Sequence, residues 1–489
     1  MRFLKITLRI CDCKMFWRVI IVVIAIQNAH PNVEAQPKCL SSDGYYSGEC
    51  HMGTKTPYRQ IGNSDDSQLN YSGCTQKKIW MMLRHGTRFP GKDMTIRWIE
   101  RLPKLQEKIL QNYYMKKSSI SAEAAEEFVK WSQTLSIKDN SKLHAEGERE
   151  MFDLAKRCQA RFTTLLSGKF NNESYKIKYT PTRPTEKSAK YFALGLFGSE
   201  EAQKVWYHPL DKKDIVLRSY KRCNRWQNEV KHNPAAYEEY NSFLNSIIVE
   251  EMLDDLSERL GLSIDYDAAN LMYQACALET AWDKNYNSPW CKVFSLDNLK
   301  VLEYAEDLEY YWIDSYGFNL TYQQSCPALR DVFEFFQADE DRIATLYFTH
   351  SGSLLKLLAL LGLANETKPL TNDSFEEHRD NRVWRTSAID AFASNLGFVL
   401  YDCEKTGPSI LAFHQERVAQ IPGCPADAPC PIAVFESIYS ESINHCHFDE
   451  ICGNNVEDNR NGNTPSSHVN FVLTFLMVLF ATSRHPLFT

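Results

Sequence analysis

The chain has 489 residues, enough for two or three domain-sized units with their own hydrophobic cores. Its hydrophobic content of 44% and charged content of 24% are ordinary for a globular protein. The formal net charge of −7 argues against a general nucleic-acid-binding protein, so any cations that bind an anion must be gathered locally.

The first 35 residues have the pattern of a secretory signal peptide. Five basic residues precede the apolar run 19–26, and Val33-Glu34-Ala35 follows as a plausible cleavage site. The run is short for a membrane span, and a signal anchor is the alternative. We predict a signal peptide over residues 1–35 and a secreted or cell-surface protein, with the lumen of the endoplasmic reticulum as a further location.

The cysteines and glycosylation sequons fit this route. Two of the fifteen cysteines lie in the leader, and the odd number that follows implies at least one that is free, intermolecular or removed by processing. Zinc-type Cys-x-x-Cys pairs are lacking, so disulfides in an oxidising compartment are the better explanation. The Asn-x-Ser/Thr sequons predict glycosylation at Asn70, Asn172, Asn319, Asn365 and Asn372.

Residues 36–75 contain three cysteines and little periodicity, which predicts an irregular, disulfide-pinned N-terminal segment. The apolar run 78–83 predicts a buried strand, and it ends abruptly in Arg84-His85-Gly86-Thr87-Arg88-Phe89-Pro90. Ligands bind at this edge of open α/β sheets. Paired guanidinium groups grip phosphate bidentately, and a histidine among them can attack phosphorus and become phosphohistidine. For any one of these residues alone, a surface charge is the alternative.

A second position of interest follows the alternating strand pattern 175–180. Arg183 stands after this strand and before a helical segment, where a third phosphate clamp could enter beside a helix N-terminus. An arginine at such a position is, by itself, more often a surface charge. Helical spacing of apolar residues also predicts helices over 94–110, 122–135 and 146–162.

The middle of the chain predicts an α-helical insert domain over 188–315, because its composition is helical and charged without an obvious strand. It divides the α/β unit into 76–187 and 316–455. A basic cluster early in the insert is explained as a solvated helix face or as contacts to an anionic substrate. Lys92, just past the heptad, is the one lysine that we predict to contact the substrate.

Strand character returns at 342–349 and is followed by His350 and the apolar helix pattern 354–361. Two further strand patterns cover 397–401 and 409–413, and a cysteine-rich region closes the fold. Alternation of strands and helices predicts an α/β protein with a mainly parallel central sheet flanked by helices.

The C-terminal residues 456–489 combine a polar spacer with a short apolar tail. This pattern is typical of a glycolipid (GPI) anchor signal. The apolar tail is too short for a transmembrane helix, which needs about 20 apolar residues. The alternative is a disordered hydrophobic tail. The predicted membrane contact is therefore a lipid anchor.

The heptad resembles the signature of the histidine acid phosphatases, and its full form is most similar to their multiple inositol polyphosphate phosphatase branch. The resemblance covers roughly residues 75–420 and includes the run 391–401. It implies a histidine-phosphatase-like fold, without metal or organic cofactor. It also implies site residues: His85 as nucleophile, His350 as the second histidine that stabilises the phosphoryl group, and Arg84, Arg88 and Arg183 as phosphate clamps.

One departure concerns the general acid. Most branches of this family place an aspartate directly after the second histidine, and the inositol polyphosphate branch uses His-Ala-Glu, whereas this chain has His350-Ser351-Gly352. The triplet His144-Ala145-Glu146 is a decoy, because it precedes a helix and follows no apolar strand. Loss of an acid typically costs about 10²–10⁴-fold when the leaving group needs a proton.

The resemblance implies a phosphomonoesterase for inositol polyphosphates such as phytate, with 2,3-bisphosphoglycerate as a further candidate. The alternative is a phosphatase-like ectodomain that binds polyphosphates with weak or no turnover. A phosphotransferase or mutase is disfavoured by secretion. The preferred substrate, the proton donor and the oligomeric state do not follow from the sequence.

Overall fold

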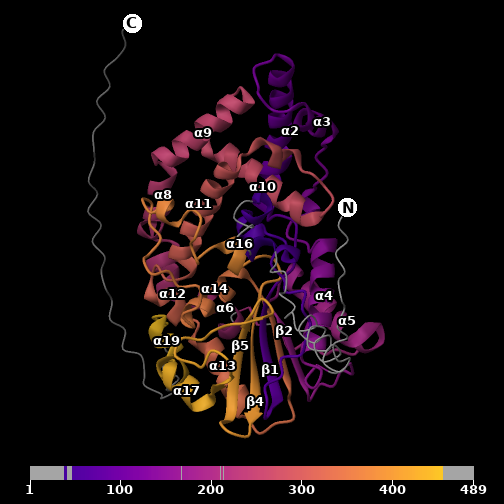
Figure 1. Ribbon diagram of the computed structural model, residues 1–489, viewed down its shortest axis with the longest axis vertical. Helices are drawn as coiled ribbons and strands as arrows, with labels where there is room; N and C mark the ends of the chain where they lie inside the picture. Colours follow the sequence, from indigo (N-terminus) through magenta and orange to yellow (C-terminus); the bar gives the residue numbers. More distant parts are fainter. Residues whose placement is uncertain (1–37, 41–46, 167, 210, 213, 455–489) are drawn as a thin grey trace, which may run out of the picture. The chain divides into compact units, whose positions relative to one another are not determined.

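A central β-sheet between two helical layers positions the chemistry-bearing residues (Figure 1). The computed structural model describes residues 38–40, 47–166, 168–209, 211–212 and 214–454. The predicted signal peptide and the predicted anchor tail lie outside the described residues, and neither is tested here.

The sheet has the strand order β2-β3-β1-β4-β5-β6, with β7 paired to β5. Strands β1, β2 and β3 are mutually parallel, whereas β4 runs antiparallel to β1 and β5 antiparallel to β4. Their bounds are β1 Cys74–Arg84, β2 Tyr175–Tyr179, β3 Ala344–Thr349, β4 Asn395–Cys403, β5 Gly407–His414, β6 Arg417–Val418 and β7 Cys430–Pro431. The five strands predicted from the sequence are confirmed as β1 to β5.

The predicted α/β class with a central sheet flanked by helices is confirmed, but the sheet is mixed rather than mainly parallel. The physical reason is the length of one connection. Only residues 404–406 join β4 to β5, and a parallel pair needs a crossover of about a dozen residues or more. The two strands therefore form a hairpin, in which β4 runs against β1 and β3 while β5 runs in the same direction as they do.

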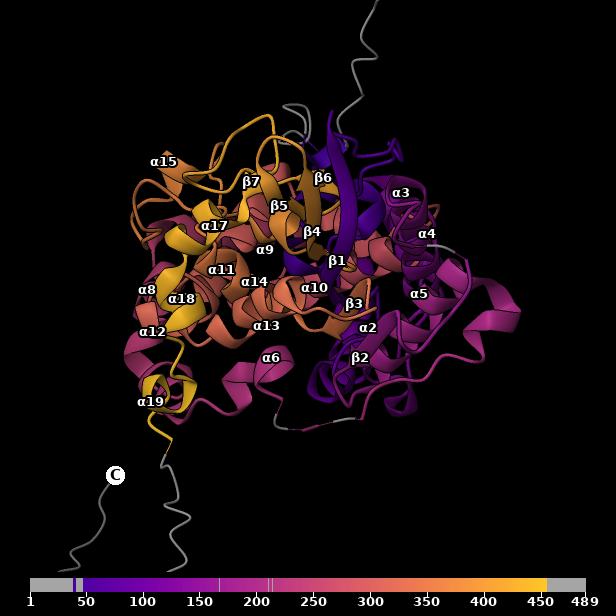
Figure 2. The ribbon, with the colours of Figure 1, turned by 90° about the horizontal axis from the view of Figure 1, so that it is seen from below.

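Strand β1 is buried on both faces, which explains its continuous apolar run. Ile79, Met81 and Leu83 join a core that contains α4 (Ala145–Arg161) and α5 (Arg183–Ala202). Trp80 and Met82 point to the opposite core, which includes residues of α13 (Cys326–Gln337) and α14 (Ser351–Leu360). Figure 2 shows the sheet between these layers.

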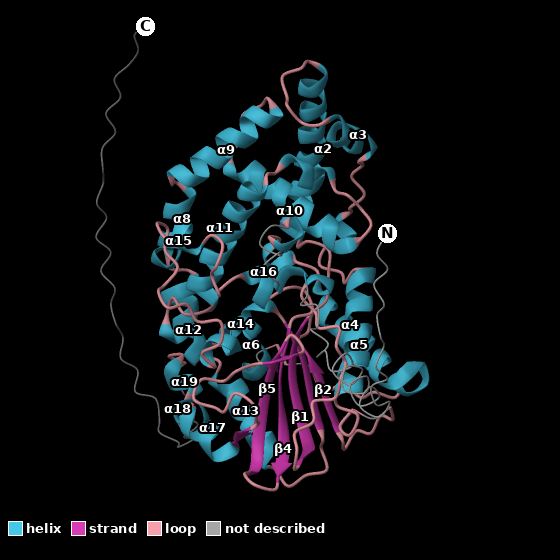
Figure 3. Cartoon of the chain, viewed as in Figure 1, coloured by secondary structure: helices cyan, strands magenta, loops and turns pink. Residues whose placement is uncertain are grey.

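The described residues between β2 and β3 form helices, with one isolated bridge at Tyr207. They share a hydrophobic core with one face of the sheet, and Figure 3 shows how much of this part is helical. The insert as a separate domain stays a prediction. The helices here are α6 Ile215–Arg218, α7 Asn224–Trp226, α8 Glu238–Leu244, α9 Ile247–Leu260, α10 Tyr266–Trp282, α11 Leu296–Asp314, α12 Asn319–Gln323 and α13 Cys326–Gln337.

The remaining helices flank the strands before and after this helical stretch. The predicted pattern at 354–361 is confirmed as α14, and the patterns at 94–110 and 122–135 as α2 and α3. Their bounds are α2 Lys92–Tyr114, α3 Ala122–Lys130, α14 Ser351–Leu360, α15 Phe375–His378, α16 Thr386–Ile389, α17 Ile432–Ile438, α18 Ser440–Asn444 and α19 Phe448–Ile451.

Disulfides pair twelve of the thirteen described cysteines, and Cys158 is the buried free thiol that the odd number required. Two bonds tie the closing region to distant helices, as the cysteine-rich C-terminal pattern suggested. The pairs are Cys39–Cys50, Cys74–Cys403, Cys223–Cys452, Cys276–Cys291, Cys326–Cys446 and Cys424–Cys430. Within the described part of the chain, none of the helices has both the length and the apolar character that a bilayer crossing demands.

Candidate active site

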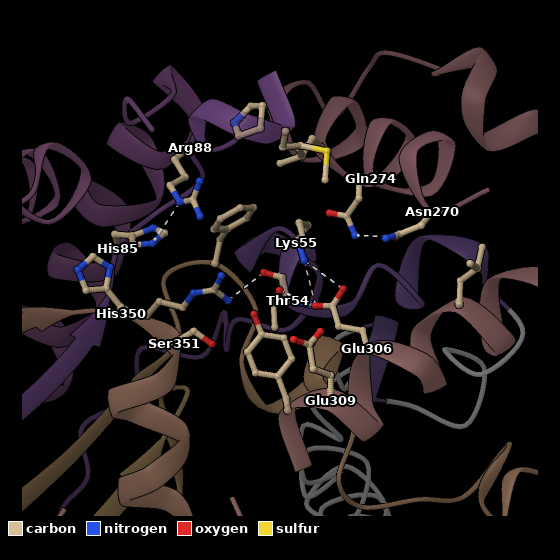
Figure 4. A pocket seen from close by; sticks show the side chains of 18 of the residues that line it. Thr54, Lys55, His85, Arg88, Asn270, Gln274, Glu306, Glu309, His350 and Ser351 are labelled. Atoms are coloured by element: carbon tan, nitrogen blue, oxygen red, sulfur yellow. Dashed lines mark hydrogen bonds and ion pairs between the residues drawn. The ribbon is translucent and has the colours of Figure 1, made fainter. Parts of the chain in front are cut away.

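The carboxyl ends of β1 and β3 open into one cavity. Arg84 is paired with Thr349 across the two parallel strands, so the residues that follow both strands emerge at the same edge. The cavity has a volume of about 390 Å³ and is lined by Arg84, His85, Arg88, His350 and Ser351, among others (Figure 4). The structure thus brings together four of the five residues that were predicted to bind or transfer phosphate.

His85 is held in the orientation that a nucleophile needs. Its Nδ1 lies 3.0 Å from the carbonyl oxygen of Gly86, which fixes the proton on Nδ1 and leaves the Nε2 lone pair available. Arg88 Nε lies 3.3 Å from this Nε2. Burial, followed by the charges of Arg88 and Arg84 and the neighbouring His350, lowers the pKa of His85 well below its ordinary value. The lowered pKa favours the neutral form of this ring.

His350 faces the first histidine from the end of β3. The two ring centroids are 5.5 Å apart in an edge-to-face arrangement. His350 Nε2 shares a hydrogen bond of 3.0 Å with Thr180 Oγ1, at the end of the neighbouring strand β2. Burial and the charges of Arg218, Arg88, Arg84 and Lys221 lower the pKa of His350 to about 3.

The two arginines of the heptad are fixed by the backbone around the cavity. Arg84 donates Nη1 to the carbonyl oxygens of Thr54 and Asp390. Its buried Nε has no hydrogen-bond partner among the described residues. Arg88 donates Nη1 to the carbonyl oxygen of Phe89 at 2.8 Å. An unpaired buried guanidinium N–H is costly, and a phosphate oxygen would satisfy it.

Helix α4 fixes the loop that carries the heptad. Glu150 accepts the N–H of Thr87 at 2.7 Å and its hydroxyl at 2.9 Å. Burial raises the pKa of this carboxyl to about 7. Gly86 and Gly147 face each other so closely that a Cβ on Gly86 would lie 2.6 Å from the Gly147 carbonyl oxygen. Both glycines are needed for this approach.

Two predicted residues lie outside the lining of this cavity. Arg183 is exposed at the first turn of α5, and Lys92 is exposed at the first turn of α2, although the adjacent Gly91 and Met94 line the cavity. Their assigned roles stay predictions. The decoy triplet has a structural role, because His144 caps α4 and its Nδ1 accepts the N–H of Glu146 at 3.2 Å.

The far wall of the cavity, opposite His350, was not predicted from the sequence. Lys55 lies there and pairs with Glu306 at 3.0 Å, while Glu309 lies next to them on α11. Burial raises the pKa of Glu309 above its ordinary value. Lys55 belongs to the irregular segment before β1, where no periodic pattern indicates which side chains point inward.

A buried carboxyl behind the cavity was also missed. Asp390 is fully buried, and its Oδ2 accepts a hydrogen bond from Ser351 Oγ and lies 3.5 Å from Arg84 Nη1. The sequence signal was a single charged residue within the apolar run 388–393. An aspartate in such a run is expected to be buried, and a buried aspartate usually has a partner.

The sequons are accessible to different degrees. Asn372 is half-buried, and its Nδ2, the atom that would carry a glycan, donates to Glu239 at 2.8 Å. Glycosylation stays a prediction at all of them. The other four asparagines are exposed, namely Asn70, Asn172, Asn319 and Asn365. Within the described ranges, no group of three or more His, Cys, Asp or Glu side chains is arranged to hold a metal ion.

Comparisons with known proteins agree with this geometry. The model of the histidine phosphatase superfamily (branch 2) matches residues 77–414. Multiple inositol polyphosphate phosphatase 1 of Drosophila melanogaster is 31% identical over 400 residues, which cover 79% of this chain and 84% of the relative. The Homo sapiens protein of the same name is 26% identical over 438 residues, with coverages of 82% and 88%.

Two solved structures share the fold. The phytase from D. castellii has a TM-score of 0.68 at 17% identity, covering 91% of this chain and 97% of the phytase. A multiple inositol polyphosphate phosphatase of Bifidobacterium longum, in complex with inositol hexasulfate, has a TM-score of 0.58 at 15% identity, with coverages of 78% and 95%. The chain belongs to the histidine phosphatase superfamily, branch 2, and within it to the multiple inositol polyphosphate phosphatases.

Proposed function

We propose that this protein hydrolyses phosphate monoesters of inositol polyphosphates through a phosphohistidine on His85. The observation that carries the proposal is the orientation of this ring. Its Nδ1 is engaged by the Gly86 carbonyl oxygen, and its Nε2 lies beside the Arg88 guanidinium in the cavity. The names of the relatives support the substrate class.

In the first step, Nε2 of His85 attacks the phosphorus in line with the leaving oxygen, and the P–O bond breaks as the N–P bond forms. Arg84, Arg88 and His350 surround the transferred group. Their N–H groups stabilise the charge that spreads over the equatorial oxygens. Water then attacks the phosphohistidine, the N–P bond breaks, and phosphate leaves.

The test is phosphate release from inositol hexakisphosphate by the full-length protein. We expect His85→Ala to lower turnover by at least about 10³-fold, because the nucleophile is lost. The matched control is His445→Ala, which removes an exposed histidine outside the cavity lining and should retain turnover. Rapid acid-free quenching should trap a phosphoamidate on the parent protein only.

A different result would favour the second candidate, a polyphosphate-binding ectodomain. The observation that favours it is the lack of a carboxylate at Ser351 and Gly352. Saturable binding of inositol hexakisphosphate without release of phosphate would establish this candidate and contradict the first.

We also propose that the protein works in the secretory pathway or outside the cell, held by a C-terminal lipid anchor. Six disulfides and four exposed sequons support an oxidising, glycosylating compartment. Release of the protein from intact cells by a phosphatidylinositol-specific phospholipase would support the anchor. Retention after that treatment would contradict it.

A further inference from the structure

A phosphatase that cleaves alkyl phosphates needs a group that protonates the leaving oxygen, and neither residue after His350 is a carboxylic acid. We propose that Ser351 delivers this proton and that Asp390 supplies it through the hydrogen bond between the two side chains. This inference rests on the proposed function. It assigns to two residues of this chain the role that a single acid usually fills.

Ser351 has the required position. It follows His350 directly as the first residue of α14, and it lines the cavity on the His350 side (Figure 4). A hydroxyl group donates one proton and accepts hydrogen bonds through two lone pairs, so it can pass a proton on while it receives another. Serine itself is a poor acid at neutral pH, so it needs a proton source behind it.

Asp390 is that source. It ends α16 and lies fully buried behind the cavity wall, where its Oδ2 receives the hydrogen bond from Ser351 Oγ. Its Oδ1 has no hydrogen-bond partner among the described residues. A buried carboxylate is unfavourable when one of its oxygens lacks a hydrogen-bond partner. Burial with an unpaired Oδ1 therefore favours the neutral form of Asp390.

The charges that act on Asp390 come from β1 and α11, and a hydrogen bond comes from α14. Burial raises the pKa of Asp390 to about 6, Arg84 on β1 and the hydrogen bond from Ser351 lower it, and Asp314 and Glu306 on α11 raise it. A bound phosphate dianion would offset the positive charge of Arg84. The protonated form of Asp390 is therefore favoured further when substrate is present.

Each of the two steps conserves protons. As the P–O bond breaks, the leaving oxygen takes the proton of Ser351 Oγ, and this Oγ takes the proton of Asp390, which becomes a carboxylate. In the second step, water attacks phosphorus and gives a proton to Ser351 Oγ, whose own proton returns to Asp390. The electron pair of the N–P bond returns to His85.

Two other carboxyl groups lie near enough to compete. Glu309 lines the cavity, but Figure 4 shows it beside Glu306 on the opposite side from His350. Asp314 lies next to Gly352, where an added Cβ would be 3.2 Å from its Oδ1. It forms an ion pair with the buried Lys356 and is not among the residues that line the cavity.

The leaving group separates these possibilities. An aryl phosphate such as p-nitrophenyl phosphate leaves without a proton, whereas an alkyl phosphate such as glycerol 2-phosphate needs one. For the full-length protein, we expect Ser351→Ala and Asp390→Asn each to lower kcat/KM by about 100-fold on the alkyl phosphate and by less than about threefold on the aryl phosphate. Ser351→Asp should keep the alkyl activity, even when combined with Asp390→Asn.

The pH profile gives a second readout. The alkyl-to-aryl ratio of kcat/KM should fall as the pH rises above about 6 in the parent protein, because Asp390 loses its proton. In Asp390→Asn the ratio should be low and independent of pH. Ser353→Ala is the matched control on the same helix, since Ser353 Oγ donates to the Leu217 carbonyl oxygen at 2.7 Å and lies outside the cavity lining. It should behave like the parent.

Equal losses on both substrates in Ser351→Ala and Asp390→Asn would overturn the inference, because the pair would then only position Arg84. A loss confined to the alkyl phosphate in Glu309→Gln, with Ser351→Ala unaffected, would overturn it in favour of Glu309. A parent protein inactive on both substrates is a separate result that overturns the proposed function itself.

Discussion

The protonation state of His85 depends on its burial and on its immediate neighbours. Burial lowers its pKa most, and Arg88, Arg84 and His350 lower it further. The two guanidinium groups proposed to bind phosphate therefore also favour the neutral form of His85, the proposed nucleophile. Because kcat/KM reports the ionisation of the free enzyme, this effect is measurable.

We expect acid to leave the nucleophile intact between pH 7 and pH 5. A histidine with an ordinary pKa of about 6.5 would lose about 25-fold of its neutral form over this range, whereas His85 has a lowered pKa and should lose far less. The measurement is kcat/KM for p-nitrophenyl phosphate, corrected for ionisation of the substrate. A fall of about 25-fold in the corrected value would contradict the lowered pKa.

Among the cavity residues, those that directly follow a strand could be predicted from the sequence, whereas the others could not. His85 and His350 could be placed because each ends an apolar run, and the parallel pairing of β1 with β3 brings them together. Lys55 comes from an irregular segment, so its approach to the cavity depends on tertiary packing. Asp390 could have been singled out as a lone charge in an apolar run, but its contact with Ser351 could not.

The loop after β1 keeps its shape because α4 packs against it without side chains between them. A Cβ on Gly147 would lie 2.2 Å from the Thr87 carbonyl oxygen and 2.6 Å from its nitrogen. Both contacts are with backbone, which cannot rotate away. Three residues later on the same helix, Glu150 binds the Thr87 N–H and hydroxyl.

Gly147→Ala should therefore destabilise the fold and displace the heptad. Overpacking of this kind costs about 1–3 kcal/mol or more, and we expect a corresponding loss in urea-unfolding free energy together with reduced phosphate release. Gly168→Ala is the control, because a Cβ there meets nothing nearer than Gln159 Nε2 at 3.9 Å. Equal stability of the two variants would show that the close approach is not required.

Element types followed from periodicity more readily than element pairing. The runs at 397–401 and 409–413 were identified as strands, but their antiparallel pairing depends on the short connection 404–406. That connection was visible in the sequence. The boundaries of the α-helical insert do not follow from the sequence, because the helices between β2 and β3 share one hydrophobic core with the sheet.

Over the whole molecule, charge is distributed unevenly. The net charge is −7, yet Arg84 and Arg88 lie together in the cavity, at the end that also holds His85 and His350. The far wall carries Lys55 with two carboxyl groups, Glu306 and Glu309. A substrate with several phosphates must therefore place some of its negative charge near this wall, where the ionisation of Glu309 opposes binding.

This charge arrangement predicts a pH-dependent affinity for highly phosphorylated substrates. Burial raises the pKa of Glu309 above its ordinary value of 4.5, so the group is neutral at low pH and becomes negative as the pH rises. Two unit charges about 10 Å apart repel by about 1.7 kcal/mol at an effective dielectric constant of about 20. The KM for inositol hexakisphosphate should therefore rise with pH, by up to about tenfold from this group.

Glu309→Gln should remove most of that rise while leaving the KM for p-nitrophenyl phosphate nearly unchanged, because a monophosphate reaches only the arginine end. Glu441→Gln, which removes an exposed carboxylate on α18, is the charge-matched control. If Glu309→Gln left the KM for the hexakisphosphate as pH-dependent as in the parent, the far wall would not contact the outer phosphates. The substrate would then lie toward the cavity mouth, and its affinity would come from Arg84 and Arg88 alone.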